Sequence, residues 1–232
     1  MIQFETKHYI FNYHKSSLAE TDIHEIAACQ EACWSYICAV LKTEPSFKIE
    51  YTLCNTPEEV GRIYGDDEPC NAFARYPDKV IAVYNDSVKC IGFHEDAHCI
   101  SYTRFRPESP AVREGLAMYF DRVWWGIPNL SWVGHYLKSG RYISIDELMD
   151  RDTFFSIDCS VSYPIMGAFT DYLIATYGID AYLDFYEHTD AHQAFTDVFQ
   201  KSSEELNAEF VSYARLFRID SALECRMEEL LK

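Results

Sequence analysis

The sequence predicts an α+β fold in which a small N-terminal mixed sheet with helices precedes a mainly helical C-terminal part. Strand-like runs occur only before residue 88, and helical periodicity dominates after it, an order typical of the α+β class. The chain has 232 residues, of which 48% are hydrophobic and 25% charged, so it can bury a sizeable core. We therefore expect a single domain over residues 1–232, with an N-terminal α/β lobe at about 1–105 and a helical lobe at about 106–232.

The first elements alternate strand and helix. Residues 4–13 alternate apolar and polar side chains and predict one strand, and residues 47–54 predict a second. Between them, apolar residues at helical spacing predict a helix over 21–42, with Asp22 and Glu25 as a capping box.

A second short helix and two further strands complete the predicted N-terminal lobe. Residues 56–65 predict a helix with Thr56 as its cap and Pro57 in its first turn. Residues 71–77 and 78–85 then predict two strands separated by a Pro-Asp turn.

The whole chain after residue 88 is predicted to be helical, with clear signals at several helix boundaries. Polar caps and prolines predict helix starts, and glycine predicts a helix end. These boundary residues are Ser109 with Pro110, Tyr163 with Pro164, Gly178, and Ser202 with Glu205.

Charge and composition exclude several classes of partner. A net charge of −17 argues against nucleic acid and against anionic membrane surfaces, both of which require clustered Lys and Arg. No run approaches the ~20 apolar residues of a membrane span. The first residues lack a secretory signal, and the nine cysteines show no paired spacing, so we expect a cytoplasmic protein with reduced thiols. The oligomeric state is not set by these features.

Residues 94–98, His-Glu-Asp-Ala-His, match the pattern H-E-x-x-H. Random placement would produce such a match in roughly 2% of sequences of this composition. On a helix, His94 and His98 project from one face and can hold a single ion, while Phe93, Ala97 and Ile100 form an apolar stripe on another side.

A zinc ion held by two histidines needs another protein ligand, with one position left for water. After the Pro-bearing turn at 104–110, Glu114 lies near the start of the next predicted helix. The small residues Gly115 and Ala117 permit close helix packing there. Glu114 is therefore the candidate third ligand.

These residues carry a resemblance. The run HEDAH followed by EGLAMYFD resembles the gluzincin zinc metallopeptidases, which are peptidase MA-like proteins with a glutamate ligand on a following helix. The runs YPIMGAFTDYLIATYG and AFTDVFQKSSEELNAEFVSYARLF are similar to the helical lobe of that superfamily. The similarity covers about residues 75–216 and implies a zincin-like fold with the H-E-x-x-H helix at the active site.

The resemblance implies the role of each site residue. His94, His98 and Glu114 would bind Zn²⁺, and Glu95 would be the general base of peptide hydrolysis. Tyr163 is the candidate donor to the oxyanion of the tetrahedral intermediate.

His135 and Tyr136 are alternatives to Tyr163 as the oxyanion donor. The sequence also departs from the superfamily pattern. Some gluzincins have an aspartate four residues after the glutamate ligand, where this chain has Met118. Asp121 lies ~10 Å along the helix axis from Glu114, so we do not expect it to orient a ligand there. Asp96 would either face solvent or hold a neighbouring loop.

Several other features have simpler interpretations. Cys29 and Cys33 could pair on a metal, but with Trp34 they form a stripe that favours a core position. His188 and His192 are four residues apart in a polar stretch, which favours the surface. The tryptophans after the ligand helix favour packing over a substrate subsite; they are Trp124, Trp125 and Trp132.

The predicted function is zinc-dependent hydrolysis of peptide bonds in a peptide or protein substrate. An edge strand at 71–76 or 79–85 could align an extended peptide by backbone hydrogen bonds. The alternative is a catalytically silent protein that keeps the zinc site as a binding module. A metal-free helical protein with a chance motif, and a zinc hydrolase of non-peptide amides, also remain open.

Overall fold

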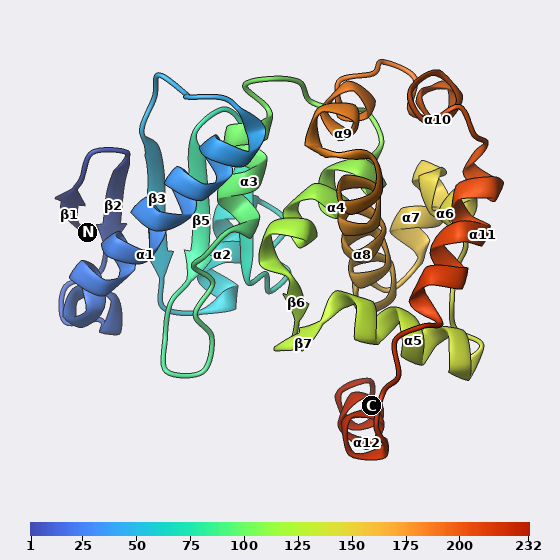
Figure 1. The fold of residues 1–232 in the computed structure, drawn as a ribbon. Coiled ribbons are helices and arrows are strands. Elements are labelled where there is room, and N and C mark those ends of the chain that lie inside the picture. Colours follow the sequence, from blue (N-terminus) through green and yellow to red (C-terminus); the bar gives the residue numbers. More distant parts are fainter. The chain divides into compact units, whose positions relative to one another are not determined.

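The computed structural model describes all 232 residues and confirms the α+β class (Figure 1). The chain divides into two compact units, Met1–Arg104 and Phe105–Lys232. The first unit holds the five-stranded sheet with three helices, and the second is mainly helical. That the two units form one zincin-like domain stays a prediction.

The sheet of the first unit is mixed, with the strand order β1-β2-β3-β5-β4. β2, β3 and β5 run parallel, whereas β1 and β4 pair antiparallel at the two edges. The strands are β1 (Ile2–Glu5), β2 (Tyr9–Tyr13), β3 (Ile49–Cys54), β4 (Ala72–Arg75) and β5 (Lys79–Val83).

The single strand predicted over residues 4–13 is wrong, because β1 and β2 form a hairpin there. The chain turns at Thr6, whose backbone N–H donates to Tyr9 O at 2.9 Å. The Thr6 hydroxyl accepts from Tyr9 N at 3.2 Å, so one threonine holds both sides of the turn. The turn contains no Gly, Pro, Asn or Asp, which is why the reversal leaves little trace in the sequence.

Three helices pack on this sheet: α1 (Leu18–Leu41), α2 (Pro57–Tyr64) and α3 (His94–Ser101). α1 starts three residues before the predicted helix because Ser17 caps it, accepting from Glu20 N at 3.2 Å. The predicted capping box of Asp22 with Glu25 is therefore wrong. α2 begins after the cap Thr56 and carries a proline in its first turn, as predicted.

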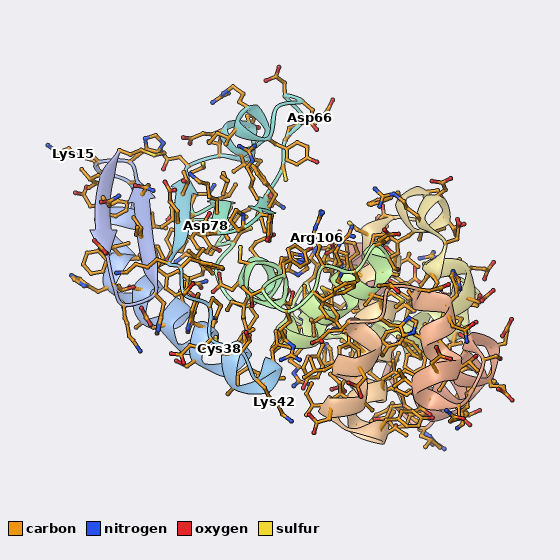
Figure 2. The ribbon with its side chains drawn as sticks, turned by 90° about the horizontal axis from the view of Figure 1, so that it is seen from above. Lys15, Cys38, Lys42, Asp66, Asp78 and Arg106 are labelled. Carbon is orange, nitrogen blue, oxygen red and sulfur yellow. The ribbon has the colours of Figure 1, made fainter.

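The two faces of the sheet carry different helices. Tyr9 and Tyr51 point to the face where α1 and α3 lie, and the Tyr9 hydroxyl reaches both helices. On the other face, Val60 of α2 packs with Cys54 and Ile81 in a buried apolar cluster. Figure 1 shows α1 lying across the strands. In Figure 2, Cys38 and Lys42 mark the C-terminal end of α1.

The second unit is built around the helices α4 (Pro110–Asp121) and α8 (Cys159–Tyr177), which pack closely against each other. Two glycines permit this approach. A Cβ on Gly115 would lie 2.8 Å from Thr170 Oγ1, and a Cβ on Gly167 would lie 2.6 Å from Met118 Cβ. The remaining helices are α5 (Asn129–Ser139), α6 (Ile145–Met149), α7 (Arg151–Ser156), α9 (Ile179–Tyr186), α10 (Ala191–Phe199), α11 (Ser203–Ala214) and α12 (Ser221–Leu230).

The expectation that everything after residue 88 is helical is wrong at one point. β6 (Val123–Trp124) and β7 (Ile127–Pro128) form a small antiparallel hairpin. α4 ends at its C-cap Arg122, with φ +67°, and the hairpin turn places Trp125 at φ +52° and Gly126 at φ +72°, the left-handed region that reverses the chain.

α8 begins at Cys159, with Asp158 as its cap, and not after Tyr163 and Pro164 as predicted, so Pro164 lies inside the helix. A proline there has no N–H to donate to the carbonyl of Ser160. The Tyr136 hydroxyl donates to that carbonyl at 2.6 Å and replaces the missing bond. The predicted end at Gly178, with φ +88°, is confirmed, as is the capping box of α11. None of the helices has both the length and the apolar character needed to cross a membrane.

Candidate metal centre

The helix α3 presents the three residues of the H-E-x-x-H motif. The ring centroids of His94 and His98 lie 5.1 Å apart, with the ring planes at 82°. His98 is buried with 7% of its surface exposed, while His94 and Glu95 are half-buried. The four-residue spacing therefore places both imidazoles side by side in partial shelter from water, as the sequence predicts.

Tyr102, one turn after His98, fixes the orientation of that imidazole. The Tyr102 hydroxyl lies 3.3 Å from His98 Nδ1, and the two rings contact each other at 5.7 Å. A hydrogen-bond partner on one ring nitrogen holds the imidazole in one orientation. We did not predict a role for Tyr102 from the sequence. Its position four residues after His98, on the same helical face, was the signal that could have indicated one.

Asp96, in the middle of the motif, is fully buried rather than solvent-facing. Its Oδ2 accepts from Gln30 Nε2 at 2.9 Å and is in close contact with the Tyr9 hydroxyl. Tyr9 belongs to β2 and Gln30 to α1, so Asp96 connects α3 to the sheet and to α1. Neither expectation holds, because Asp96 is buried and binds a strand and a helix rather than facing solvent or holding a loop.

Gln30 also holds the chain segment that leads into α3. Its Nε2 donates to Gly92 O at 3.1 Å, and its Oε1 accepts from Gly92 N at 2.7 Å. Gly92 has φ +128°, which favours glycine over other residues. The N-cap residue Phe93 provides no side-chain cap, so this amide pair fixes the position from which His94 begins the helix.

Burial raises the pKa of the Asp96 carboxyl well above its ordinary value. The hydrogen bonds that Asp96 accepts from Tyr9 and Gln30 lower this pKa, but burial is the larger effect. Asp96 Oδ1 has no partner, and an unpaired buried oxygen costs less when it carries no charge.

Cys99 lies one residue after His98, but its chemistry disfavours a metal ligand. Burial, followed by the nearby carboxyls of Asp96 and Glu95, raises the pKa of this thiol well above its ordinary value. Thiolates rather than thiols bind metal. The candidate ligands of this helix are therefore the two imidazoles.

Glu114 lies in the second turn of α4 and is half-buried. His94, His98 and Glu114 each offer one ligand atom, and these atoms all lie within 4.8 Å of one another. Two imidazole nitrogens and a carboxylate oxygen are a donor set that Zn²⁺ accepts. The three residues selected from the sequence thus form a group that could hold a metal ion.

The candidate oxyanion donors all belong to the second unit. Tyr163 lies inside α8, not before it as predicted, and its ring contacts those of Trp124 and Phe154 at 5.8 and 5.9 Å. Tyr136 is fully buried and donates its hydroxyl to a backbone carbonyl. His135 is 1% exposed, and burial lowers its pKa. Burial disfavours both alternatives, and the catalytic role of Tyr163 stays a prediction.

Met118 and Asp121, the two positions after Glu114 that were considered for orienting a ligand, differ in burial on α4. Met118 is fully buried and packs on Gly167 of α8. Asp121 is the last residue of α4 and half-buried.

The cysteine pair of α1 separates between core and surface. Cys33 is buried with 3% of its surface exposed, as expected, but Cys29 is exposed, contrary to the core prediction. A hydrogen bond from Cys33 lowers the pKa of Cys29 to about 6.

The histidines at 188 and 192 lie at the surface, one half-buried and one exposed, in agreement with the sequence-based expectation. The tryptophans after the ligand helix divide between core and surface. Trp132 is buried and donates to Trp124 O at 3.0 Å, whereas Trp125 remains 45% exposed.

The two strands considered as a platform for peptides differ in position. β4 is an edge of the sheet, while β5 lies between β3 and β4. Of these two strands, only β4 therefore has a row of backbone groups without a neighbouring strand.

Comparison with known proteins gave no match, neither to a protein-family model nor to a curated sequence.

Proposed function

We propose that this chain is a zinc-dependent metallopeptidase whose ligands are His94, His98 and Glu114. The observation that carries the proposal is the grouping of one ligand atom from each of these residues within 4.8 Å. The grouping joins the two motif histidines to the glutamate that the sequence selected independently.

The donor set supports zinc over other common metals. Imidazole favours Zn, Cu, Fe and Ni, whereas Mg and Ca prefer oxygen ligands only. Three protein ligands are the number found in catalytic zinc sites, where the fourth position is left for water or substrate. When bound, zinc would lower the pKa of its water to about 7 and polarise the scissile carbonyl.

Glu95 would act as the general base. It would accept a proton from the attacking water and deliver it to the nitrogen of the departing amine, which leaves a carboxylic acid and a free amine. A zinc site kept for stability or for binding a partner does not require this carboxylate, so Glu95 favours catalysis over the silent binding module. Tyr163 is proposed to donate its hydroxyl to the developing oxyanion.

The sheet edge supports a peptide as the substrate. β4 pairs with β5 on one side and leaves its other side without a strand. An extended peptide could add to this edge through main-chain hydrogen bonds, a frequent mode of peptide recognition.

The test combines metal analysis with a peptide-library cleavage assay. We expect about one zinc per wild-type chain, and a loss of zinc in His98→Ala but not in His24→Ala, an exposed histidine of α1. We expect Glu95→Gln to keep zinc and to lose cleavage by at least about a hundredfold. Zinc binding with equal behaviour of wild type and Glu95→Gln on every peptide would favour the binding module instead.

A further inference from the structure

A cavity of about 650 Å³ lies wholly within the second unit and is lined by residues from four separate segments. None of the metal candidates lines it. Its volume lies in the range of pockets that bind small organic ligands. The lining residues with ionisable side chains are Arg106, Glu108, Arg113, Arg151, His188, Asp190 and His192.

Three arginines at one cavity are unusual in this chain, which carries a net charge of −17 and only 20 lysines and arginines. Arg106 precedes α4, Arg113 is on α4, and Arg151 begins α7. The fold therefore brings positive charge together from distant parts of the sequence. Low-dielectric walls concentrate such a field and attract anions.

Arg113 is held in place by two backbone carbonyls of the loop before α4. Its Nη1 donates to Pro107 O at 2.7 Å and to Glu108 O at 2.9 Å. Both bonds use one nitrogen, so Nη2 and Nε are the donors that remain for a ligand. A guanidinium fixed in this way loses little freedom when it binds an oxyanion through two parallel hydrogen bonds.

The lining holds two acids, Glu108 and Asp190, against three arginines, so its net charge stays positive. Asp190 caps α10, accepting from the backbone N–H groups of His192 and Gln193 at 3.0 Å each. These bonds lower the pKa of Asp190 and direct its carboxylate to the helix end. Glu108 is exposed at the rim and is the other acid of the lining.

The two histidines differ in what they can offer a ligand. His188 Nδ1 accepts from Asp190 N at 3.1 Å, and its Nε2 lies 3.2 Å from Asp197 Oδ2, so both nitrogens are in use within the protein. His192 is exposed on the first turn of α10 and can turn its imidazole to the cavity.

We infer that this cavity binds a small organic anion through its arginines, with a phosphate or carboxylate group as the recognised part. The site is separate from the proposed peptidase function and does not depend on metal. Phosphate and carboxylate share the planar pairs of oxygens that guanidinium matches, so the two sources must be distinguished by experiment.

The test uses the full-length protein with inorganic phosphate and succinate as probes, each titrated in turn by calorimetry. We expect saturable one-site binding of at least one probe below about 10 mM, with the tighter probe identifying the recognised group. Arg151→Glu should weaken it by at least about tenfold. The control Arg218→Glu makes the same change of charge at an exposed position away from the cavity.

The metal-site variant His98→Ala should bind the probe as the wild type does, which separates this inference from the proposed function. Equal weakening by Arg151→Glu and Arg218→Glu would overturn it, because the effect would then be one of net charge. Absence of saturable binding of both probes to the wild type would also overturn it.

Discussion

Replacing the Gln30 side chain is the strongest test of how α3 is held in the first unit. Gln30 is fully buried, and its amide makes three hydrogen bonds, two with Gly92 and one with Asp96. In Gln30→Ala all three are lost, at about 1 kcal/mol each. We expect the first unit to lose about 3 kcal/mol of stability, with a further loss wherever a group left behind stays buried without a partner.

Hydrogen exchange of the amides of residues 92–101 measures this loss within the first unit, and urea unfolding gives the accompanying shift of the midpoint. The matched control is Gln3→Ala. Gln3 is exposed and makes one hydrogen bond, at 3.3 Å to Asn12, so its loss should stay within about 0.5 kcal/mol. A loss below about 1 kcal/mol in Gln30→Ala would refute the anchoring role of this amide.

Three further predictions concern other parts of the structure. The metal-free wild type should lose stability as pH rises above about 4, because the raised pKa of buried Asp96 makes the folded state hold a proton that the unfolded state releases. Metal-free Asp96→Asn should not show this loss. Urea midpoints from pH 4 to 8 measure it, and parallel profiles for wild type and variant would argue against a buried neutral carboxyl. Tyr102→Phe should weaken zinc binding by about tenfold by removing the hydroxyl at His98 Nδ1, while the exposed Tyr64→Phe should not; zinc competition with a chromophoric chelator measures both, and equal affinities would contradict the orienting role. Gly167→Ala should destabilise the second unit by about 1–3 kcal/mol, because the added Cβ would lie 2.6 Å from Met118 Cβ; an unchanged melting temperature would show that α4 and α8 can move apart without cost.

Local signals in the sequence predicted much of the fold. Caps are short-range chemistry, so Thr56, Gly178 and the box of Ser202 with Glu205 are placed as the sequence indicated. Where a long-range contact replaces a local rule, prediction was wrong. Pro164 lies inside α8 because Tyr136, 28 positions earlier, supplies the bond that proline cannot make. Nothing local to Pro164 reveals that partner.

The candidate site divides in the same way. His94, His98 and Glu114 could be selected from the sequence by residue type and spacing. The contacts that hold α3 in place could not be predicted, because Tyr9 and Gln30 reach Asp96 across 87 and 66 positions of the chain. Such contacts depend on the packing of β2 and α1 against α3, which periodicity does not encode.

The most direct test of the central claim is a zinc titration of wild type, Glu114→Gln and Glu229→Gln. Glu229 is an exposed glutamate of the second unit and serves as the matched control. The proposed ligand set predicts one tight site in the wild type and the control, and an affinity lower by at least about tenfold in Glu114→Gln. Equal zinc affinity in all three proteins would show that Glu114 is not a ligand and would contradict the proposed centre.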